Sequence, residues 1–261
     1  MKNFRTYGDP PYKVVVLHGG PGAPGQMAPV ARELFSRRGV LEPLQTKSNL
    51  EGQVQELFLV LEKNCAFPVT LIGSSWGAML GFIFSAYHPM FVKKLILVGS
   101  GVFEKKYAEK IQEKRLNRLN LHDREEIQVL LDRLSIPAER DKNKLFNRLG
   151  ELMTKADAYN PLTLETEIIK VQYELHQNVW KDVVKIRNNG ELLELGKRIE
   201  CPVVAIHGDY DPHPVEGIKN PLSSVLNNFK FILLKNCGHL PWIEKEAKSE
   251  FYAVLEKELP L

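Results

Sequence analysis

The chain has 261 residues, of which 44% are hydrophobic and 26% charged, a composition typical of a soluble globular protein whose core needs neither disulfides nor metals. Its 35 basic and 32 acidic residues leave a formal net charge of +3, and no basic run is interleaved with aromatic residues, so we expect no nucleic-acid partner. Three scattered cysteines, no Cys/His cluster, no signal-peptide pattern and no apolar run of membrane length predict a cytoplasmic protein without a metal site or a membrane partner.

Up to about residue 102, short apolar runs alternate with longer stretches of helical periodicity. Strands that are buried on both faces read as continuous apolar runs, so this alternation predicts an α/β fold with a mostly parallel central sheet and helices on both faces. The predicted strands here are residues 13–17, 69–72 and 94–98, and the predicted helices are residues 26–37, 49–62 and 76–88.

From residue 103 to residue 195 the strand signal disappears, and leucine and isoleucine recur at helical spacing among many charged residues. We expect these residues to form a helical cap or lid, inserted into a core made of residues 1–102 and 196–261. Two more strands are predicted at residues 202–206 and 229–234, followed by a closing helix at residues 241–257. The cap is expected to line the substrate pocket.

Residues 73–77, Gly-Ser-Ser-Trp-Gly, fit the Gly-x-Ser-x-Gly pattern of a nucleophile elbow. A nucleophilic serine needs its hydroxyl raised above the sheet edge on a tight turn, and the flanking glycines remove Cβ atoms that would clash there. The pattern lies between a predicted strand and a predicted helix, which is the context it requires. Ser75 is therefore the candidate nucleophile, whereas its neighbour Ser74 lacks the flanking spacing.

A second glycine-rich segment, His-Gly-Gly-Pro-Gly at residues 18–22, directly follows the first predicted strand. An acyl-transfer intermediate carries an oxyanion that needs two converging backbone N–H groups. Trp76, directly after the candidate nucleophile, would supply one of them. Gly20 is the candidate for the other, because Pro21 has no N–H.

Candidates for an acid and a base follow the last two predicted strands. Asp209 and Asp211 both come directly after residues 202–206, and either carboxylate could serve a triad, although Asp209 could instead cap the turn. His239 lies in the loop after the last strand and titrates near neutrality, so it can take and return a proton. His213 follows Asp211 too closely to be a good base on geometry.

Together these motifs resemble the α/β-hydrolase superfamily and, within it, the prolyl aminopeptidase-like branch. The resemblance covers the regions before and after the insertion and implies that Asp211 is the triad acid and His239 the base. The Gly-Gly-Pro-Gly run and the tryptophan after the serine are features of that branch. An aminopeptidase needs a buried carboxylate to hold the substrate's ammonium group. Glu174 in the insertion is the candidate, with a helix-surface glutamate as the alternative interpretation.

The sequence thus predicts a serine hydrolase that cleaves a small-molecule or short-peptide ester, amide or peptide through an acyl-enzyme, without a cofactor. A carboxylesterase or a carbon–carbon bond hydrolase is the alternative within this class. A non-catalytic ligand-binding or partner-docking protein on the same fold is the alternative outside it, as is transfer to an acceptor other than water. The sequence predicts no oligomeric state.

Overall fold

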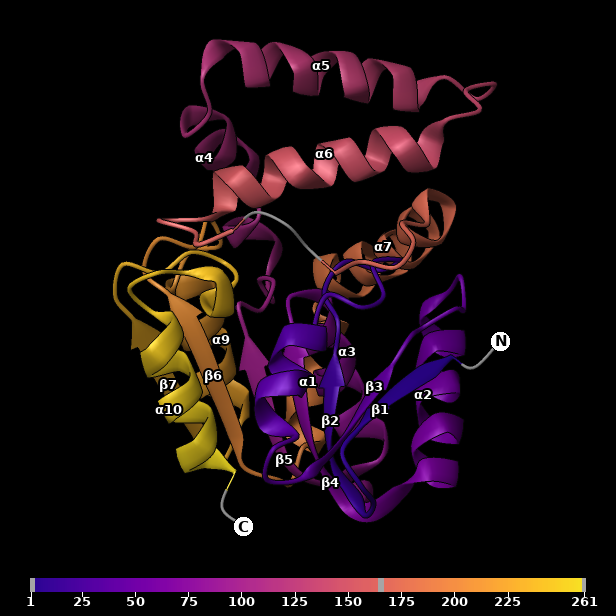
Figure 1. The fold of residues 1–261 in the computed structure, drawn as a ribbon, viewed down its shortest axis with the longest axis vertical. Coiled ribbons are helices and arrows are strands. Elements are labelled where there is room, and N and C mark those ends of the chain that lie inside the picture. The colour runs from indigo at the N-terminus through magenta and orange to yellow at the C-terminus, as the bar shows by residue number, and fades with distance from the viewer. Residues whose placement is uncertain (1–2, 164–166, 260–261) are drawn as a thin grey trace.

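The computed structural model describes residues 3–163 and 167–259. In this part of the chain, seven strands form one sheet in the order β1-β3-β2-β4-β5-β6-β7 (Figure 1). β1 pairs antiparallel with β3 at one edge, and every other neighbouring pair is parallel. The strands are β1 (Phe4–Tyr7), β2 (Tyr12–Leu17), β3 (Gly39–Pro43), β4 (Cys65–Ser74), β5 (Val92–Val98), β6 (Val203–Gly208) and β7 (Phe229–Leu234).

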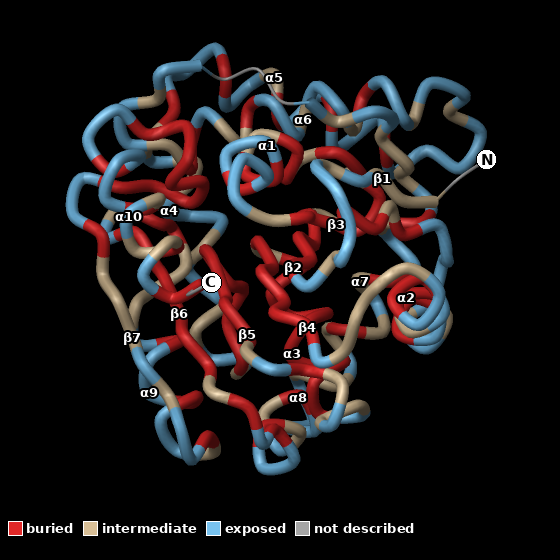
Figure 2. The backbone as a smooth tube through the Cα atoms, turned by 60° about the horizontal axis from the view of Figure 1, so that its bottom comes forward, coloured by how far each residue is buried: buried red, intermediate tan, exposed pale blue. Residues whose placement is uncertain are grey.

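The central strands are buried on both faces, as a parallel sheet between two helix layers requires (Figure 2). In β2, Val14 and Val16 belong to one apolar cluster while Val15 and Leu17 belong to the other, because successive side chains point to opposite faces. Each such fully buried aliphatic side chain contributes about 1.5–3 kcal/mol of transfer free energy. The continuous apolar runs of the sequence are therefore explained by burial on two sides.

Helices from both halves of the sequence cover the two faces. On one face lie α1 (Ala28–Leu34) and α10 (Lys248–Glu258), and on the other α2 (Leu50–Asn64), α3 (Trp76–Tyr87) and α9 (Glu216–Val225). Asn49 caps α2 by accepting a hydrogen bond from the Gly52 N–H at 2.6 Å. The fold class expected from the sequence is thereby confirmed.

Between β5 and β6 the described elements are all helical. They are α4 (Ile111–Asn117), α5 (Leu121–Ser135), α6 (Lys142–Asp157), α7 (Tyr173–Asn188) and α8 (Glu191–Glu194). Short 3₁₀ helices lie at Pro89–Phe91, Lys105–Tyr107, Leu195–Arg198 and Pro241–Ile243. α5 and α6 pack side by side above the sheet around an apolar cluster of their own, whereas Val179 and Val183 of α7 belong to the main core (Figure 1).

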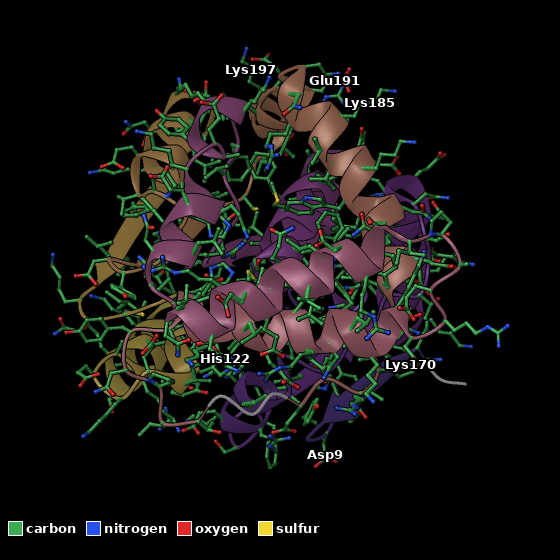
Figure 3. All side chains as sticks on the ribbon, turned by 90° about the horizontal axis from the view of Figure 1, so that it is seen from above. Asp9, His122, Lys170, Lys185, Glu191 and Lys197 are labelled. Carbon is green, nitrogen blue, oxygen red and sulfur yellow. The ribbon has the colours of Figure 1, made fainter. Side chains whose placement is uncertain are left out.

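Seen from above, the helices between β5 and β6 lie across the molecule, and the labelled side chains of Lys185, Glu191 and Lys197 point outward at its rim (Figure 3). The helices found between β5 and β6 agree with the helical periodicity of residues 103–195. The division of the chain into a core and a separate cap stays a prediction. No described helix combines the length and the apolar character needed to cross a bilayer.

Four features differ from the sequence-based expectation. β1, β3 and α9 were not predicted. The predicted closing helix at residues 241–257 is wrong over its first turns, because α10 begins only at Lys248, after a 3₁₀ turn at Pro241–Ile243. Glu244 has extended backbone (φ −82°, ψ 127°) and forms an isolated antiparallel bridge with Pro161. The Ile243 carbonyl accepts from the Leu162 N–H at 2.7 Å, so the backbone here pairs with another segment and does not continue as a helix.

Candidate active site

Ser75 sits on a strained turn between β4 and α3. Its backbone has φ 52° and ψ −111°, and it is one of only two described non-glycine residues with positive φ. Such a conformation costs an L-residue on the order of 1–3 kcal/mol and persists only where the surroundings enforce it. Here the Ser75 N–H donates to the Val98 carbonyl at 2.9 Å, which fixes the turn against the end of β5.

The two flanking glycines are required by the close packing of backbone around this turn. A Cβ atom on Gly73 would lie 2.2 Å from the Gly77 carbonyl oxygen, and one on Gly77 would lie 2.2 Å from the Leu17 carbonyl oxygen. No side chain longer than hydrogen fits at either position. The steric reason given for the Gly-x-Ser-x-Gly pattern therefore holds in the folded chain.

The glycine-rich loop after β2 lies against the serine. A Cβ atom on Gly19 would come within 3.2 Å of the Ser75 Cβ, and the Gly19 N–H donates to Gln26 Oε1 at 2.7 Å. Gly20 adopts φ +48°. Over the described ranges, the N–H groups of Gly20 and Trp76 donate no hydrogen bond, so both are free to bind an incoming oxyanion.

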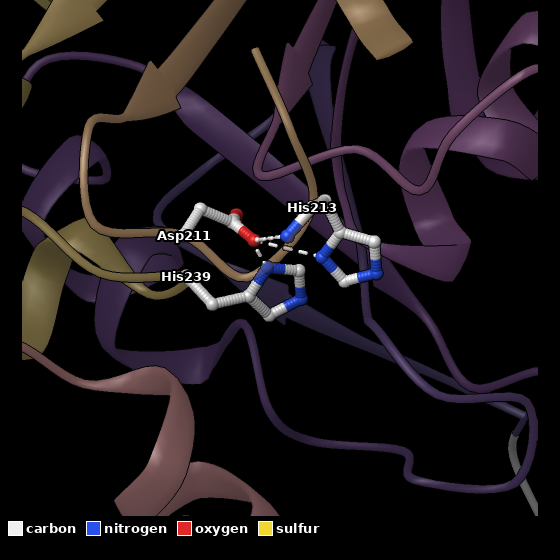
Figure 4. Close-up of side chains that lie close together, drawn as sticks. All are labelled: Asp211, His213 and His239. Carbon is white, nitrogen blue, oxygen red and sulfur yellow. Dashed lines mark hydrogen bonds and ion pairs between the residues drawn. The ribbon is translucent and has the colours of Figure 1, made fainter. Parts of the chain in front are cut away.

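Asp211 and His239 form a buried hydrogen-bonded pair. His239 Nδ1 lies 2.7 Å from Asp211 Oδ2 (Figure 4). An ionised carboxylate can only accept, so Nδ1 carries the proton and Nε2 is left with the lone pair that a general base needs. Asp209, by contrast, is exposed and accepts a 3.3 Å hydrogen bond from the Cys237 N–H, which matches its alternative role in the turn.

The charges of this pair stabilise each other. Burial alone would raise the pKa of Asp211, but the imidazoles of His239, His207 and His213 outweigh it and hold this pKa well below its ordinary value. Burial likewise lowers the pKa of His239, but the charge and hydrogen bond of Asp211 outweigh burial and raise it above its ordinary value. Asp211 is therefore ionised at neutral pH and favours the imidazolium that forms during proton transfer.

Ser75 and His239 contact consecutive residues at the end of β5. The serine N–H bonds Val98, and a Cβ atom on the next residue, Gly99, would lie 2.4 Å from the His239 carbonyl oxygen. Within residues 3–163 and 167–259, no hydrogen bond joins the serine hydroxyl to the imidazole. The structure thus brings the predicted acid and base together, while the role of Ser75 as their partner stays a prediction.

His213 is a member of the site that sequence reasoning set aside. Its Nδ1 lies 2.7 Å from Asp211 Oδ1, and its ring stacks on that of His239 at a centroid separation of 4.9 Å (Figure 4). The sequence feature that could have indicated this role is its position two residues after Asp211, because an aspartate often accepts a hydrogen bond from the backbone N–H two residues further on. That bond is present here at 2.9 Å.

An ion pair between α4 and α6 also approaches the base. Arg115 of α4 binds Asp157 of α6 through two hydrogen bonds, 2.7 Å from Nε to Oδ1 and 2.6 Å from Nη2 to Oδ2. The Asp157 carbonyl oxygen accepts a hydrogen bond from the His239 N–H at 3.0 Å. Nothing in the sequence singled out Arg115 or Asp157, because their partners are set by helix packing.

Glu244 joins the segment just after α6 to the loop that carries His239. This fully buried carboxylate accepts from the Gly238 N–H at 2.9 Å and from the N–H groups of Tyr159 and Asn160, both at 2.8 Å. A carboxylate that satisfies three backbone donors is strongly held. The base loop is therefore positioned partly by the inserted segment.

Glu174, the predicted ammonium ligand, lies in the first turn of α7 and is exposed. It lines a polar surface cavity of about 500 Å³ whose lining includes neither Ser75 nor His239. An exposed carboxylate does not meet the requirement for a buried partner, so the structure gives this prediction no support.

Among the described residues, one group could offer three metal ligands within 4.8 Å of one another, namely Asp211, His213 and His239. Each Nδ1 lies 2.7 Å from a carboxylate oxygen, which is a hydrogen-bond length. Two ligand atoms that each bind a zinc ion at about 2.0–2.2 Å in tetrahedral geometry stand farther apart than this. The group is arranged to share protons.

The family model described as "alpha/beta hydrolase fold" matches residues 58–246, which is more than half of the chain. The chain therefore belongs to the α/β hydrolase fold family and is a hydrolase by family. This confirms the superfamily expected from the motifs.

The similarity to the prolyl aminopeptidase-like branch is also confirmed. A proline iminopeptidase of Lactobacillus crispatus (strain ST1) is 24% identical over 276 residues, covering 94% of this chain and 89% of that protein. Among solved structures, the proline iminopeptidase of Mycobacterium smegmatis superposes with a TM-score of 0.62 at 18% identity, covering 98% of this chain and 93% of the other. A carboxylesterase structure from Nitrososphaera gargenis reaches 0.64 at 19% identity, covering 98% and 92%.

Proposed function

We propose that the chain is a serine hydrolase that cleaves small ester, amide or peptide substrates through an acyl-enzyme formed on Ser75. The observation that carries this proposal is the buried Asp211–His239 pair, 2.7 Å apart, at the sheet edge where the strained Ser75 turn lies. Perturbed ionisable groups beside a strained nucleophile candidate are typical of catalytic sites.

In the proposed reaction, His239 Nε2 removes the Ser75 hydroxyl proton as Oγ bonds to the substrate's carbonyl carbon. The N–H groups of Gly20 and Trp76 hold the resulting oxyanion. The intermediate collapses, the bond to the leaving group breaks, and the imidazolium returns its proton to that group. A water molecule, deprotonated by His239, then attacks the acyl carbonyl carbon; as the bond to Ser75 Oγ breaks, the imidazolium returns the proton to Oγ and the acid is released. Asp211 keeps the imidazole in the required tautomer, and no cofactor takes part.

The aminopeptidase form of this proposal draws on the similarity to proline iminopeptidases. One observation favours the carboxylesterase form instead. Asp157, the cap carboxylate next to His239, is already bound by both arms of Arg115, so its charge is not free for a substrate ammonium group. Glu174 is exposed in another cavity. A substrate without a free amine fits these charges better.

A substrate panel on the purified protein tests both forms. Prolyl amides with a free amine, the same amides N-acylated, and short aryl esters are compared by kcat/KM. If acylation of the amine leaves hydrolysis unchanged or faster, the aminopeptidase form is rejected. If none of the three is turned over, the alternative of a non-catalytic binding protein on this fold gains support.

Ser75→Ala is the matching variant. It should abolish both turnover and labelling by a fluorophosphonate probe while leaving the thermal unfolding midpoint close to that of the parent, because the change removes one oxygen atom. Labelling that persists in this variant at another residue would overturn the nucleophile assignment. The proposal includes a cytoplasmic location, in keeping with the three cysteines all being free thiols.

A further inference from the structure

The Asp211 carboxylate is held by two histidines, one on each oxygen. Oδ2 accepts from His239 Nδ1 at 2.7 Å, whereas Oδ1 accepts from His213 Nδ1 at 2.7 Å and from the His213 N–H at 2.9 Å. The proposed mechanism uses only the first of these bonds. The second histidine is nevertheless bonded to the carboxylate as closely as the base is.

His213 also contacts the base directly. The two rings stack with 4.9 Å between their centroids and 26° between their planes. His213 is itself fixed from behind, because its carbonyl oxygen lies 2.9 Å from His207 Nε2 on β6. The side chain, the N–H and the carbonyl of His213 all form hydrogen bonds, so the position of its ring is fixed.

We propose that His213 is a positioning residue that holds both the Asp211 carboxylate and the His239 ring in the geometry needed for proton transfer. This inference rests on the proposed function. The contact with substrate and with the Ser75 proton belongs to His239, and His213 acts through its two neighbours.

The arrangement favours one extra proton, and not two, on the pair of imidazoles. If both rings were imidazolium, two positive charges would face each other in a buried stack, at a cost that one carboxylate between them only partly offsets. Burial lowers the pKa of His213 and Asp211 only partly compensates, whereas the pKa of His239 is raised. The extra proton therefore resides on His239 while His213 stays a neutral donor to Asp211.

Other ionisable groups face Asp211, His213 and His239 from three elements and from the loop after β7. They are His207 of β6, with Nδ1 3.8 Å from Asp211 Oδ2, Arg115 of α4, Asp157 of α6, and the Cys237 thiol after β7. Arg115 and Asp157 neutralise each other, and burial raises the pKa of Cys237, so its thiol stays protonated. Removing the His213 side-chain donor is therefore the change that alters how strongly the negative charge of Asp211 acts on His239.

Two variants separate the two contacts of His213. Both variants keep the backbone N–H that donates to Asp211. His213→Asn also keeps a side-chain N–H donor but has no ring, and His213→Phe keeps a ring but has no side-chain donor. Without the donor, more of the negative charge of Asp211 acts on His239, so the acidic limb of kcat/KM in His213→Phe should move up by roughly one pH unit, a tenfold change in proton affinity. His213→Asn should keep the limb in place and lose roughly tenfold in kcat through the lost stacking.

The exposed His122 on α5 offers the matched control, since His122→Asn should leave both kcat and the limb unchanged. If kcat falls in both His213 variants while the acidic limb of their kcat/KM profiles stays in place, the effect is only a loss of packing and the inference is overturned. The inference is also overturned if kcat and the acidic limb of both variants equal those of the parent protein. If either variant fails to fold, imidazole ¹⁵N shifts of the unaltered protein decide, because the inference requires the Nδ1–H tautomer of His213. If Ser75→Ala retains activity, the proposed function has failed, and this outcome is separate from the result of the two His213 variants.

Discussion

The two sides of the candidate site are built in different ways. On the nucleophile side, backbone packing determines the geometry, because no Cβ atom fits at Gly73 or Gly77 and Ser75 is held at positive φ. On the base side, side chains from several elements hold Asp211 and His239 through hydrogen bonds and charge. The part of a site that depends on backbone packing is recognisable in the sequence as a short motif. The part that depends on long-range side-chain contacts is represented only by residues scattered along the chain.

The largest expected effect tests the base side. Asp211→Asn should lower kcat by about 10⁴-fold, because an amide favours the wrong imidazole tautomer and supplies no charge for the imidazolium. The pH–rate profile and steady-state kinetics on the best ester of the panel measure it. The matched variant is Asp209→Asn, an exposed carboxylate 3.7 Å from Lys235, which should stay near parental activity. Equal losses in the two variants would contradict the assignment of the acid.

A stability measurement tests the nucleophile side. Gly77→Ala should destabilise the fold by about 3 kcal/mol, because the new methyl group meets the backbone carbonyl of Leu17 at 2.2 Å and main chain cannot move aside cheaply. Gly150→Ala in α6 is the control, since its Cβ would meet nothing within 4 Å. That change should stabilise by about 0.5–1 kcal/mol through helix propensity. Urea unfolding of both variants measures the difference, and similar midpoints would refute the steric account.

The smallest expected effect is a displacement of the pH profile. The pKa of His239 is raised above 6.5, so kcat/KM should begin to fall, on acidification, at a pH higher than an unperturbed imidazole would give. The same shift stabilises the fold below the unfolded-state pKa, and that contribution is lost as pH rises through the folded-state pKa. The depressed pKa of Asp211 contributes stability that is lost as pH falls below the ordinary carboxyl range. A limb at or below pH 6.5 would show that Asp211 does not dominate the base.

Sequence reasoning reached the parts of the fold that local pattern determines. The strand predicted at residues 229–234 has the bounds of β7, and the elbow lies between β4 and α3 as its motif requires. β3 escaped prediction because its five residues include Glu42 among apolar neighbours, and its outer partner β1 has only four residues. Such short edge elements are defined by pairing, which a single segment does not reveal.

The base side could be predicted only in its two principal residues. Asp211 and His239 were found because each follows a predicted strand and fits a family pattern. The partners His213, Arg115 and Asp157 were not, since their contacts depend on how the insertion folds over the sheet. Periodicity at residues 241–257 predicted one helix, but it could not show that Glu244 turns inward to bind backbone.

The buried carboxylate of Glu244 has a mechanical consequence for how the insertion can move. Residues 159 and 160, just beyond α6, are tied through it to the residue before His239, and the Lys245 N–H adds a 3.0 Å bond to the Asn160 carbonyl. Pulling this junction open would strip a buried anion of its donors, which costs several kcal/mol. The insertion is therefore anchored in its middle, just after α6, and any movement that admits a bulky substrate must take place elsewhere and leave the imidazole in position.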